Sequence, residues 1–186
     1  MSTDPSTHLF WITSRAAGTV AMLLSSAAVG FGLLMAGKLV KGNAADRRSI
    51  HEILSLSVMV AIAVHGLSLI ADKWLHPSLL DVTLPFASSY RTLATAAGIL
   101  AGWGLIALGL SYYLRRRIGQ RRWRTIHRFT LLAWLLGLIH TLTEGTDAGQ
   151  PWFLALVAIA LAPTLALLAF RCYFQTKVAV EPGASP

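Results

Sequence analysis

Hydrophobic residues occur along this chain in long continuous runs separated by short polar connections. Five of these runs have about 20 residues each, enough for a helix to cross a hydrocarbon layer of about 30 Å. Because membrane β-barrels are built from alternating segments of about ten residues, the runs do not fit that class. The pattern predicts an all-α polytopic membrane helical bundle with five transmembrane helices. We expect them near Ala16–Ala36, Ile50–Ile70, Thr92–Leu114, Arg128–Leu142 with a polar approach from Trp123, and Trp152–Phe174.

The composition supports the same class. Of 186 residues, 55% are hydrophobic and 13% are charged, and the mean hydropathy is +0.60, which is more apolar than a soluble domain needs. The first run is preceded by Asp4 and His8 rather than by a basic cluster, so we expect a retained helix rather than a cleaved signal peptide. We expect residues 1–14 to be a polar tail, residues 15–174 the membrane domain, and residues 175–186 a short cytoplasmic tail.

Positive charge is concentrated in two of the four connections. By the positive-inside rule these two connections face the cytoplasm, which places the N-terminus outside and the C-terminus inside. A formal net charge of +8 could also suggest nucleic-acid binding. We expect lipid headgroups to be the partner instead, because the arginines lie where a membrane protein needs them for orientation. The basic residues are Lys38, Lys41, Arg47 and Arg48 in one connection, and Arg115, Arg116, Arg117, Arg121, Arg122, Arg124 and Arg128 in the other.

Four of the six histidines lie in the second and fourth apolar runs. His51 and His65 are 14 residues apart, a rise of about 21 Å and a rotation about 40° short of four turns, so both rings leave nearly the same helix face. His127 and His140 are 13 residues apart, a rise of about 19.5 Å and a rotation about 140° short of four turns. The second helix must therefore be tilted or irregular, or must present its rings on different sides.

The matched rises allow His51 to face His127 at one depth and His65 to face His140 at another. Ionisable groups inside a membrane are costly and are functional by default. Two opposing imidazoles suit a six-coordinate haem iron that transfers electrons, whereas zinc requires three or four converging ligands. The only cysteine is Cys172, so cysteine cannot hold an iron–sulfur cluster. We predict two haem b groups with bis-histidine iron, an inner one and an outer one.

Cationic partners for haem propionates are expected near the two membrane faces. Arg91, at the outer start of the third run, is the candidate for the outer haem, and Arg124, Arg128 and Arg48 are candidates for the inner haem. The inner arginines also fit a role as orientation signals alone. Trp123, in the basic connection before His127, is either an electron-relay aromatic or an interfacial anchor.

The sequence resembles the ferric reductase-like transmembrane domain family, which includes NADPH oxidases, ferric reductases and bacterial haem membrane subunits. Bis-haem members of that family carry one histidine pair in each of two helices, with the same two spacings as the pairs of this chain. Two segments carry the rest of the resemblance, which covers roughly Ala16–Phe174. They are Gly119–Arg128, followed by His140 and Glu144–Asp147, and the outer segment Leu84–Arg91.

The resemblance implies that His51 and His127 ligate the inner haem and that His65 and His140 ligate the outer one. It also implies a bacterial-type inner membrane location. Only twelve residues follow Phe174, and no glycine-rich phosphate-binding fingerprint is present. We therefore expect an oxidoreductase or electron-transfer subunit that lacks its own flavin and nicotinamide domains.

The leading hypothesis is a di-haem b-type membrane cytochrome that carries electrons between a cytoplasmic donor and an outer acceptor. The donor would be a separate flavoprotein or ferredoxin-like protein, and the acceptor a ferric chelate, oxygen or an outer redox protein. Two alternatives stay open. One is a quinone-coupled haem subunit that serves a partner oxidoreductase, and the other is a haem-free structural or assembly subunit whose histidines only form interhelical hydrogen bonds.

Overall fold

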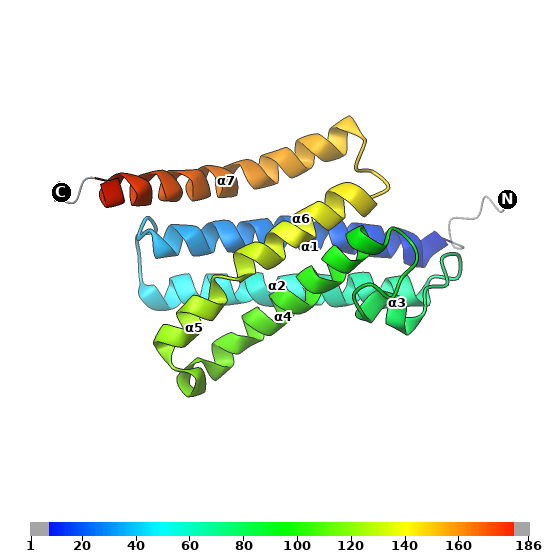
Figure 1. Ribbon diagram of the computed structural model, residues 1–186, viewed down its shortest axis with the longest axis horizontal. Coiled ribbons are helices and arrows are strands. Elements are labelled where there is room, and N and C mark those ends of the chain that lie inside the picture. Colours follow the sequence, from blue (N-terminus) through cyan, green and yellow to red (C-terminus); the bar gives the residue numbers. More distant parts are fainter. Residues whose placement is uncertain (1–7, 181–186) are drawn as a thin grey trace.

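The computed structural model describes residues 8–180, except for the side chains of Cys172 and of residues 174–180. Parts of both expected tails, residues 1–7 and 181–186, therefore lie outside the described residues. The side chain of Cys172, the single cysteine of the sequence, lies outside them as well. All regular elements of the described residues are helices (Figure 1). Its helices are α1 (Leu9–Ala36), α2 (Ala44–Ala71), α3 (Leu79–Thr83), α4 (Thr92–Ile118), α5 (Gln120–His127), α6 (Thr130–Glu144) and α7 (Pro151–Val180).

Five helical segments of the described chain are long and apolar enough to cross a membrane: α1, α2, α4, the α5–α6 pair and α7. The expected membrane helical bundle is confirmed. The first helix begins at Leu9 rather than at Ala16, because the apolar residues Leu9, Phe10 and Ile12 extend it by nearly two turns. Helix α7 likewise continues to Val180, so the first part of the expected C-terminal tail is helical.

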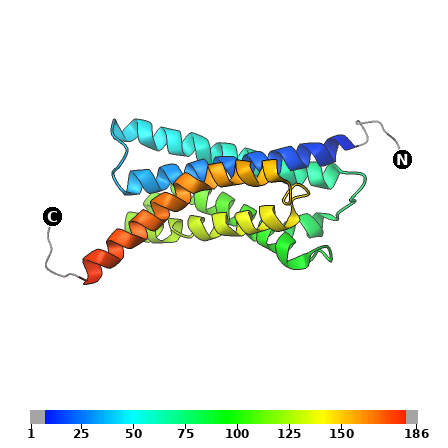
Figure 2. The ribbon, with the colours of Figure 1, turned by 90° about the horizontal axis from the view of Figure 1, so that it is seen from above.

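The five spans run antiparallel to their neighbours in the chain, and both basic connections lie at the same end of the bundle. Figures 1 and 2 show the α1–α2 and α4–α5 connections on the left, and the α2–α4 and α6–α7 connections on the right. Helix α1 packs mainly against α2, and α4 packs mainly against α6. Each pair therefore combines one histidine-bearing segment with one helix that has no paired histidine.

The outer surface of the bundle is apolar, and small hydroxyl residues lie inside it. The exposed residues Ile53, Val60 and Leu67 repeat every seven positions along one face of α2. Small hydroxyl residues allow close helix packing in a lipid environment, where an apolar outer face costs nothing. The buried hydroxyl residues are Ser14, Ser25, Ser26, Ser68 and Thr164.

The fourth span is broken between α5 and α6. Arg128 and Phe129 donate their backbone N–H groups to residues three positions earlier, and Leu131 does the same to Arg128. Such bonds belong to a 3₁₀ helix, which turns about 20° more per residue than an α-helix. In an ideal α-helix the rotation from His127 to His140 falls short of four whole turns. The extra rotation of the 3₁₀ bonds reduces this shortfall, so the two rings leave the span on more similar sides. The expected irregular helix is therefore present, and it is tighter than an α-helix at this point.

The long connection between α2 and α4 contains the short helix α3. Ser78 and Asp81 form a capping box in which the Ser78 hydroxyl donates to the Asp81 carboxylate at 2.7 Å and accepts from the Asp81 N–H at 3.2 Å. The Ser78 hydroxyl, and next its backbone N–H, hold the pKa of Asp81 below its ordinary value. Three residues other than glycine have positive φ in this connection: His76, Phe86 and Arg91. Its path is also held by other parts of the chain, because Trp103 donates to the Thr83 carbonyl and His8 packs against Trp74.

Trp134 lies at the centre of the apolar core. Its side chain is fully buried and packs in a cluster that includes Met22 and Phe153. The indole Nε1–H donates to the Ser26 hydroxyl at 3.1 Å, and Thr164 donates to the Ser26 carbonyl at 3.0 Å. The centre of the bundle thus joins α1, α6 and α7 by both packing and hydrogen bonds.

Replacing Trp134 by alanine is expected to lower the free energy of unfolding by about 3 to 5 kcal/mol, the range for deleting a buried Trp. Thermal denaturation in detergent measures the effect. The control is Trp74→Ala, because the Trp74 side chain is 63% exposed. Equal melting temperatures for the two variants would contradict the position of Trp134 in the core.

Candidate cofactor site

The four histidines of the apolar runs form two pairs across the bundle. The rings of His51 and His127 have centroids 6.3 Å apart, and so do the rings of His65 and His140. The first pair lies near the end that carries the basic connections, and the second lies toward the opposite end. We call the basic end the inner end and its histidines the inner pair, and we call the opposite end the outer end and its histidines the outer pair. Helices α2 and α5–α6 therefore bring the histidines together at two depths, in the combination that helical rise predicts.

The separation within each pair fits a metal ion between two imidazoles. A metal–imidazole bond is about 2.0–2.1 Å, and each ring nitrogen lies about 1.1 Å from its ring centre, so two rings on opposite sides of one ion have centroids about 6.3 Å apart. The observed distance is 6.3 Å in both pairs. The ring planes cross at 82° and 70°. This is compatible with two axial ligands, because rings that share a metal–nitrogen axis can cross at any angle.

Hydrogen bonds fix the tautomers of the outer pair. His65 Nδ1 lies 2.8 Å from the backbone carbonyl of Ser14, and His140 Nδ1 lies 2.9 Å from that of Ala94. A carbonyl can only accept, so each Nδ1 carries the proton and each Nε2 has a free lone pair. The Ser14 hydroxyl in turn donates to the His65 carbonyl at 3.0 Å. In metal-binding histidines, a carbonyl that accepts from one ring N–H in this way orients the other nitrogen toward the metal.

Each outer histidine ring packs against a glycine on the neighbouring helix. In both cases the glycine is four residues after the residue whose carbonyl accepts the hydrogen bond from the histidine Nδ1. A Cβ at Gly18 would lie 3.0 Å from His65 Nδ1, and a Cβ at Gly98 would lie 2.5 Å from His140 Nδ1. Ser14 and Gly18 are on α1, and Ala94 and Gly98 are on α4. Only glycine lets the ring lie flat enough on the helix to reach the carbonyl one turn away.

The inner pair repeats this arrangement less completely. Gly32 lies under His51, with a Cβ position 3.3 Å from His51 Cε1. His51 lies near the backbone of Ala28, four residues before Gly32. His127 lies near the backbone of Leu108. Neither contact reaches hydrogen-bond geometry, so both buried Nδ1 atoms lack a hydrogen-bond partner among the described residues. The rings are instead stacked, His51 on Phe31 and His127 on Trp123.

The predicted propionate partners lie at the two ends of the bundle. Arg91 is exposed beside the outer pair, and its guanidinium donates to the carbonyl of Thr143, three residues after His140. Arg124 and Arg128 are exposed at the inner end on either side of His127, and Arg48 is exposed three residues before His51. Each of the four arginines therefore lies at the end of the bundle nearer to the pair to which it was assigned.

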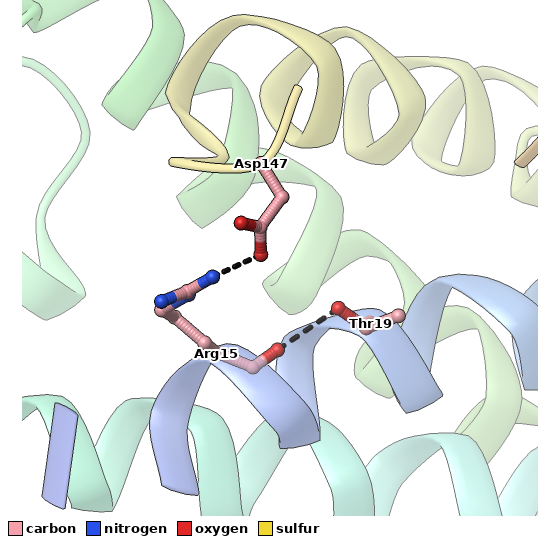
Figure 3. A network of polar contacts seen from close by, with 3 residues as sticks. All are labelled: Arg15, Thr19 and Asp147. Carbon is pink, nitrogen blue, oxygen red and sulfur yellow. Dashed lines mark hydrogen bonds and ion pairs between the residues drawn. The ribbon is translucent and has the colours of Figure 1, made fainter. Parts of the chain in front are cut away.

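A second arginine lies at the outer end. The Arg15 guanidinium forms an ion pair with Asp147 in the α6–α7 connection, as Figure 3 shows. The same guanidinium lies 4.2 Å from the ring centre of Trp11. Arg15 follows Ser14, whose carbonyl meets His65, so the ion pair links the α1 side of the outer pair to the segment after α6. Neither Arg15 nor Asp147 was predicted from the sequence for this role.

Gly18 and Ser14 were not predicted from the sequence either, although a signal for the glycine was present. Gly18 and Gly32 on α1 have the same sequence spacing as His51 and His65 on α2. Two antiparallel helices that keep their register over this length bring each glycine to one histidine. The spacing of the glycines could therefore have pointed to α1 as the helix that supports both rings.

No family model, no curated protein and no solved structure matches the chain. Among the described residues, no group of three or more His, Cys, Asp or Glu side chains converges to hold a metal ion. The histidines of the spans occur only as the two pairs described above, so the site offers two protein ligands at each of two depths.

Proposed function

We propose that this protein is a di-haem b-type membrane cytochrome in which His51 and His127 hold an inner haem, and His65 and His140 an outer one. The observation that carries the proposal is the 6.3 Å centroid separation in both pairs, combined with outer Nδ1 atoms that are already hydrogen-bonded. Haem iron held by two imidazoles exchanges single electrons while both axial positions stay filled. The ferric reductase-like family remains our proposed affiliation, and a bacterial-type inner membrane the proposed location.

Both outer histidines form interhelical hydrogen bonds, His65 with Ser14 on α1 and His140 with Ala94 on α4. These bonds use only one nitrogen of each ring. Within the described residues, the hydrogen bonds of the outer rings are made through Nδ1, and no bond joins the two rings of a pair. The Nε2 atoms are therefore left for another partner, and a haem iron held between the two rings would be such a partner.

The two sites are separated by the rise of α2 between His51 and His65, about 21 Å for 14 helical residues. Two redox centres at these depths span most of a hydrocarbon layer of about 30 Å. The basic end of the bundle would face the cytoplasm and attract an acidic electron donor, a separate flavoprotein or ferredoxin-like protein. The outer end would serve a ferric chelate, oxygen, an outer redox protein or quinone as acceptor.

Electron transfer across sealed vesicles tests the function. Purified haem-loaded protein is reconstituted into phospholipid vesicles that contain ferricyanide, and dithionite is added outside. We expect the trapped ferricyanide to be reduced much faster than in protein-free vesicles. If ferricyanide reduction stays at the protein-free rate while the haems themselves become reduced, the transmembrane function is wrong.

Arg91 is expected to raise the midpoint potential of the outer haem. Reduction adds one negative charge to the haem, and a nearby guanidinium favours that state. Arg91→Gln should therefore lower the potential of one component in a potentiometric titration, and Arg91→Lys should largely preserve it. Arg117→Gln, which removes the same charge at the opposite end of α4, is the control. An unchanged titration for Arg91→Gln would rule out this role.

A further inference from the structure

His127 is the one paired histidine without a glycine beneath it. His51, His65 and His140 lie over Gly32, Gly18 and Gly98. The backbone near His127 is that of Leu108. For the other three histidines, a glycine follows the corresponding backbone residue by four positions, but the residue four positions after Leu108 is Tyr112. The inner pair thus differs from the outer pair by a cluster of aromatic side chains beside His127.

The cluster runs from the His127 ring toward the surface. Trp123 stacks on His127 with centroids 4.9 Å apart and planes 25° apart. The ring centroids of Tyr112 and Trp123 are 5.9 Å apart, and those of Tyr113 and Tyr112 are 5.5 Å apart. The Tyr113 side chain is exposed, and its hydroxyl donates to Glu52, the residue after His51, at 2.5 Å. Conjugated rings therefore connect an inner histidine to the edge of the basic end.

The indole of Trp123 is held inward rather than toward the lipid headgroups. A tryptophan that only anchors a helix at the interface directs its N–H to water or headgroups. Here Nε1–H donates to the Ser111 hydroxyl of α4 at 3.1 Å, and Ser111 donates to the carbonyl of Leu108. The hydrogen bond and the stacking together fix the ring plane against His127. This orientation favours the relay interpretation of Trp123 over the anchoring one.

We propose that Trp123 and Tyr112 form the path by which electrons from the cytoplasmic donor reach the inner haem, a proposal that rests on the haem assignment of His51 and His127. Tunnelling weakens steeply with distance and is stronger through rings in contact than across a gap. One electron would leave the reduced flavin of the donor, and one ferric haem iron held by His51 and His127 would become ferrous. No bond forms or breaks in this chain, and the aromatic rings supply only electronic coupling.

The surface around the path fits an acidic donor. The Arg115 guanidinium lies 3.8 Å from the ring centre of Tyr112, and the exposed Arg116 and Arg117 follow on the same helix end. A negatively charged flavoprotein would be steered to this end of the bundle, which places its cofactor near the outer edge of the cluster. Further exposed arginines surround Trp123 in the sequence: Arg121, Arg122 and Arg124.

Stopped-flow reduction of the purified haem-loaded protein tests the path. The probe is a reduced flavodoxin, an acidic flavoprotein that delivers single electrons. We expect Trp123→Leu to slow haem reduction by about tenfold or more, an increase of about 1.4 kcal/mol in the activation free energy. Trp123→Phe should react close to the wild-type rate, because it keeps an aromatic ring against His127.

Haem content, the low-spin absorption bands and the midpoint potentials are measured on the same samples. They should be unchanged in Trp123→Leu, and Trp103→Leu at the outer part of α4 should reduce like the wild type. A wild-type rate for Trp123→Leu would overturn the relay, and so would a loss of rate that merely follows lost haem or a changed potential. If the wild type itself contains no haem that dithionite can reduce, the proposed function fails rather than the path.

Discussion

Replacement of His65 by alanine is expected to leave one haem per chain and to abolish electron transfer across the membrane. His65 is the α2 ligand of the outer pair, and its ring is fixed by the Ser14 carbonyl at 2.8 Å. Without it, His140 alone would hold the outer iron, and a bis-imidazole centre cannot form. The inner haem, held about 21 Å away along the helix, should remain low-spin and reducible. Haem quantitation and the vesicle assay measure the two effects.

Two further variants separate ligand loss from misfolding. His65→Gly leaves a space into which free imidazole can bind, so added imidazole should restore the low-spin outer haem. His76→Asn changes a histidine in the outer connection while keeping a residue that tolerates its positive φ, and it should retain both haems. Two haems in the His65→Ala protein would contradict the assignment of His65 as a ligand.

The change Gly98→Ala is expected to remove the outer haem even though it adds a single methyl group. A Cβ at this position would lie 2.5 Å from Nδ1 and 2.6 Å from Cγ of His140. The imidazole would have to leave the Ala94 carbonyl, and its ring could no longer keep its present place opposite His65. Haem content and the absorption spectrum of the purified variant show the effect.

Gly102→Ala, one turn further along α4, is the matched control. Its Cβ would make an ordinary 3.5 Å contact with Ile62, so both haems should be retained. Gly to Ala in a helix interior is favourable by about 0.8–1.0 kcal/mol, so Gly102→Ala should be at least as stable as the wild type. If the Gly98→Ala and Gly102→Ala proteins bind the same amount of haem, the contact between Gly98 and His140 does not define the site.

The spans and the pairing of the histidines could be predicted from the sequence because both follow from helical rise. Continuous apolar runs of about 20 residues have few alternatives to a membrane helix, and rises of about 21 and 19.5 Å bring the histidines to matching depths. The angle about the helix axis between the rings of His127 and His140 was harder to predict. The spacing of His127 and His140 required an irregular helix, and the structure supplies it as i to i−3 hydrogen bonds at Arg128 and Phe129.

The residues that support the outer histidines could not be predicted in the same way, because they belong to other helices. The contact of His65 with Ser14 and Gly18 depends on the register of α1 against α2. That register is set by packing across the bundle rather than by local sequence. The stack of Trp123 on His127 is different, because the two residues are four positions apart on α5 and such neighbours share one helix face. Local periodicity therefore predicts the second contact but not the first.

The most direct test of the central claim is a reduced-minus-oxidised absorption spectrum with haem quantitation on the purified protein. Two histidine pairs with centroids 6.3 Å apart predict two low-spin b-type haems per chain. One haem per chain would contradict the paired sites, and a folded, colourless protein from haem-replete cells would return all four histidines to a structural role.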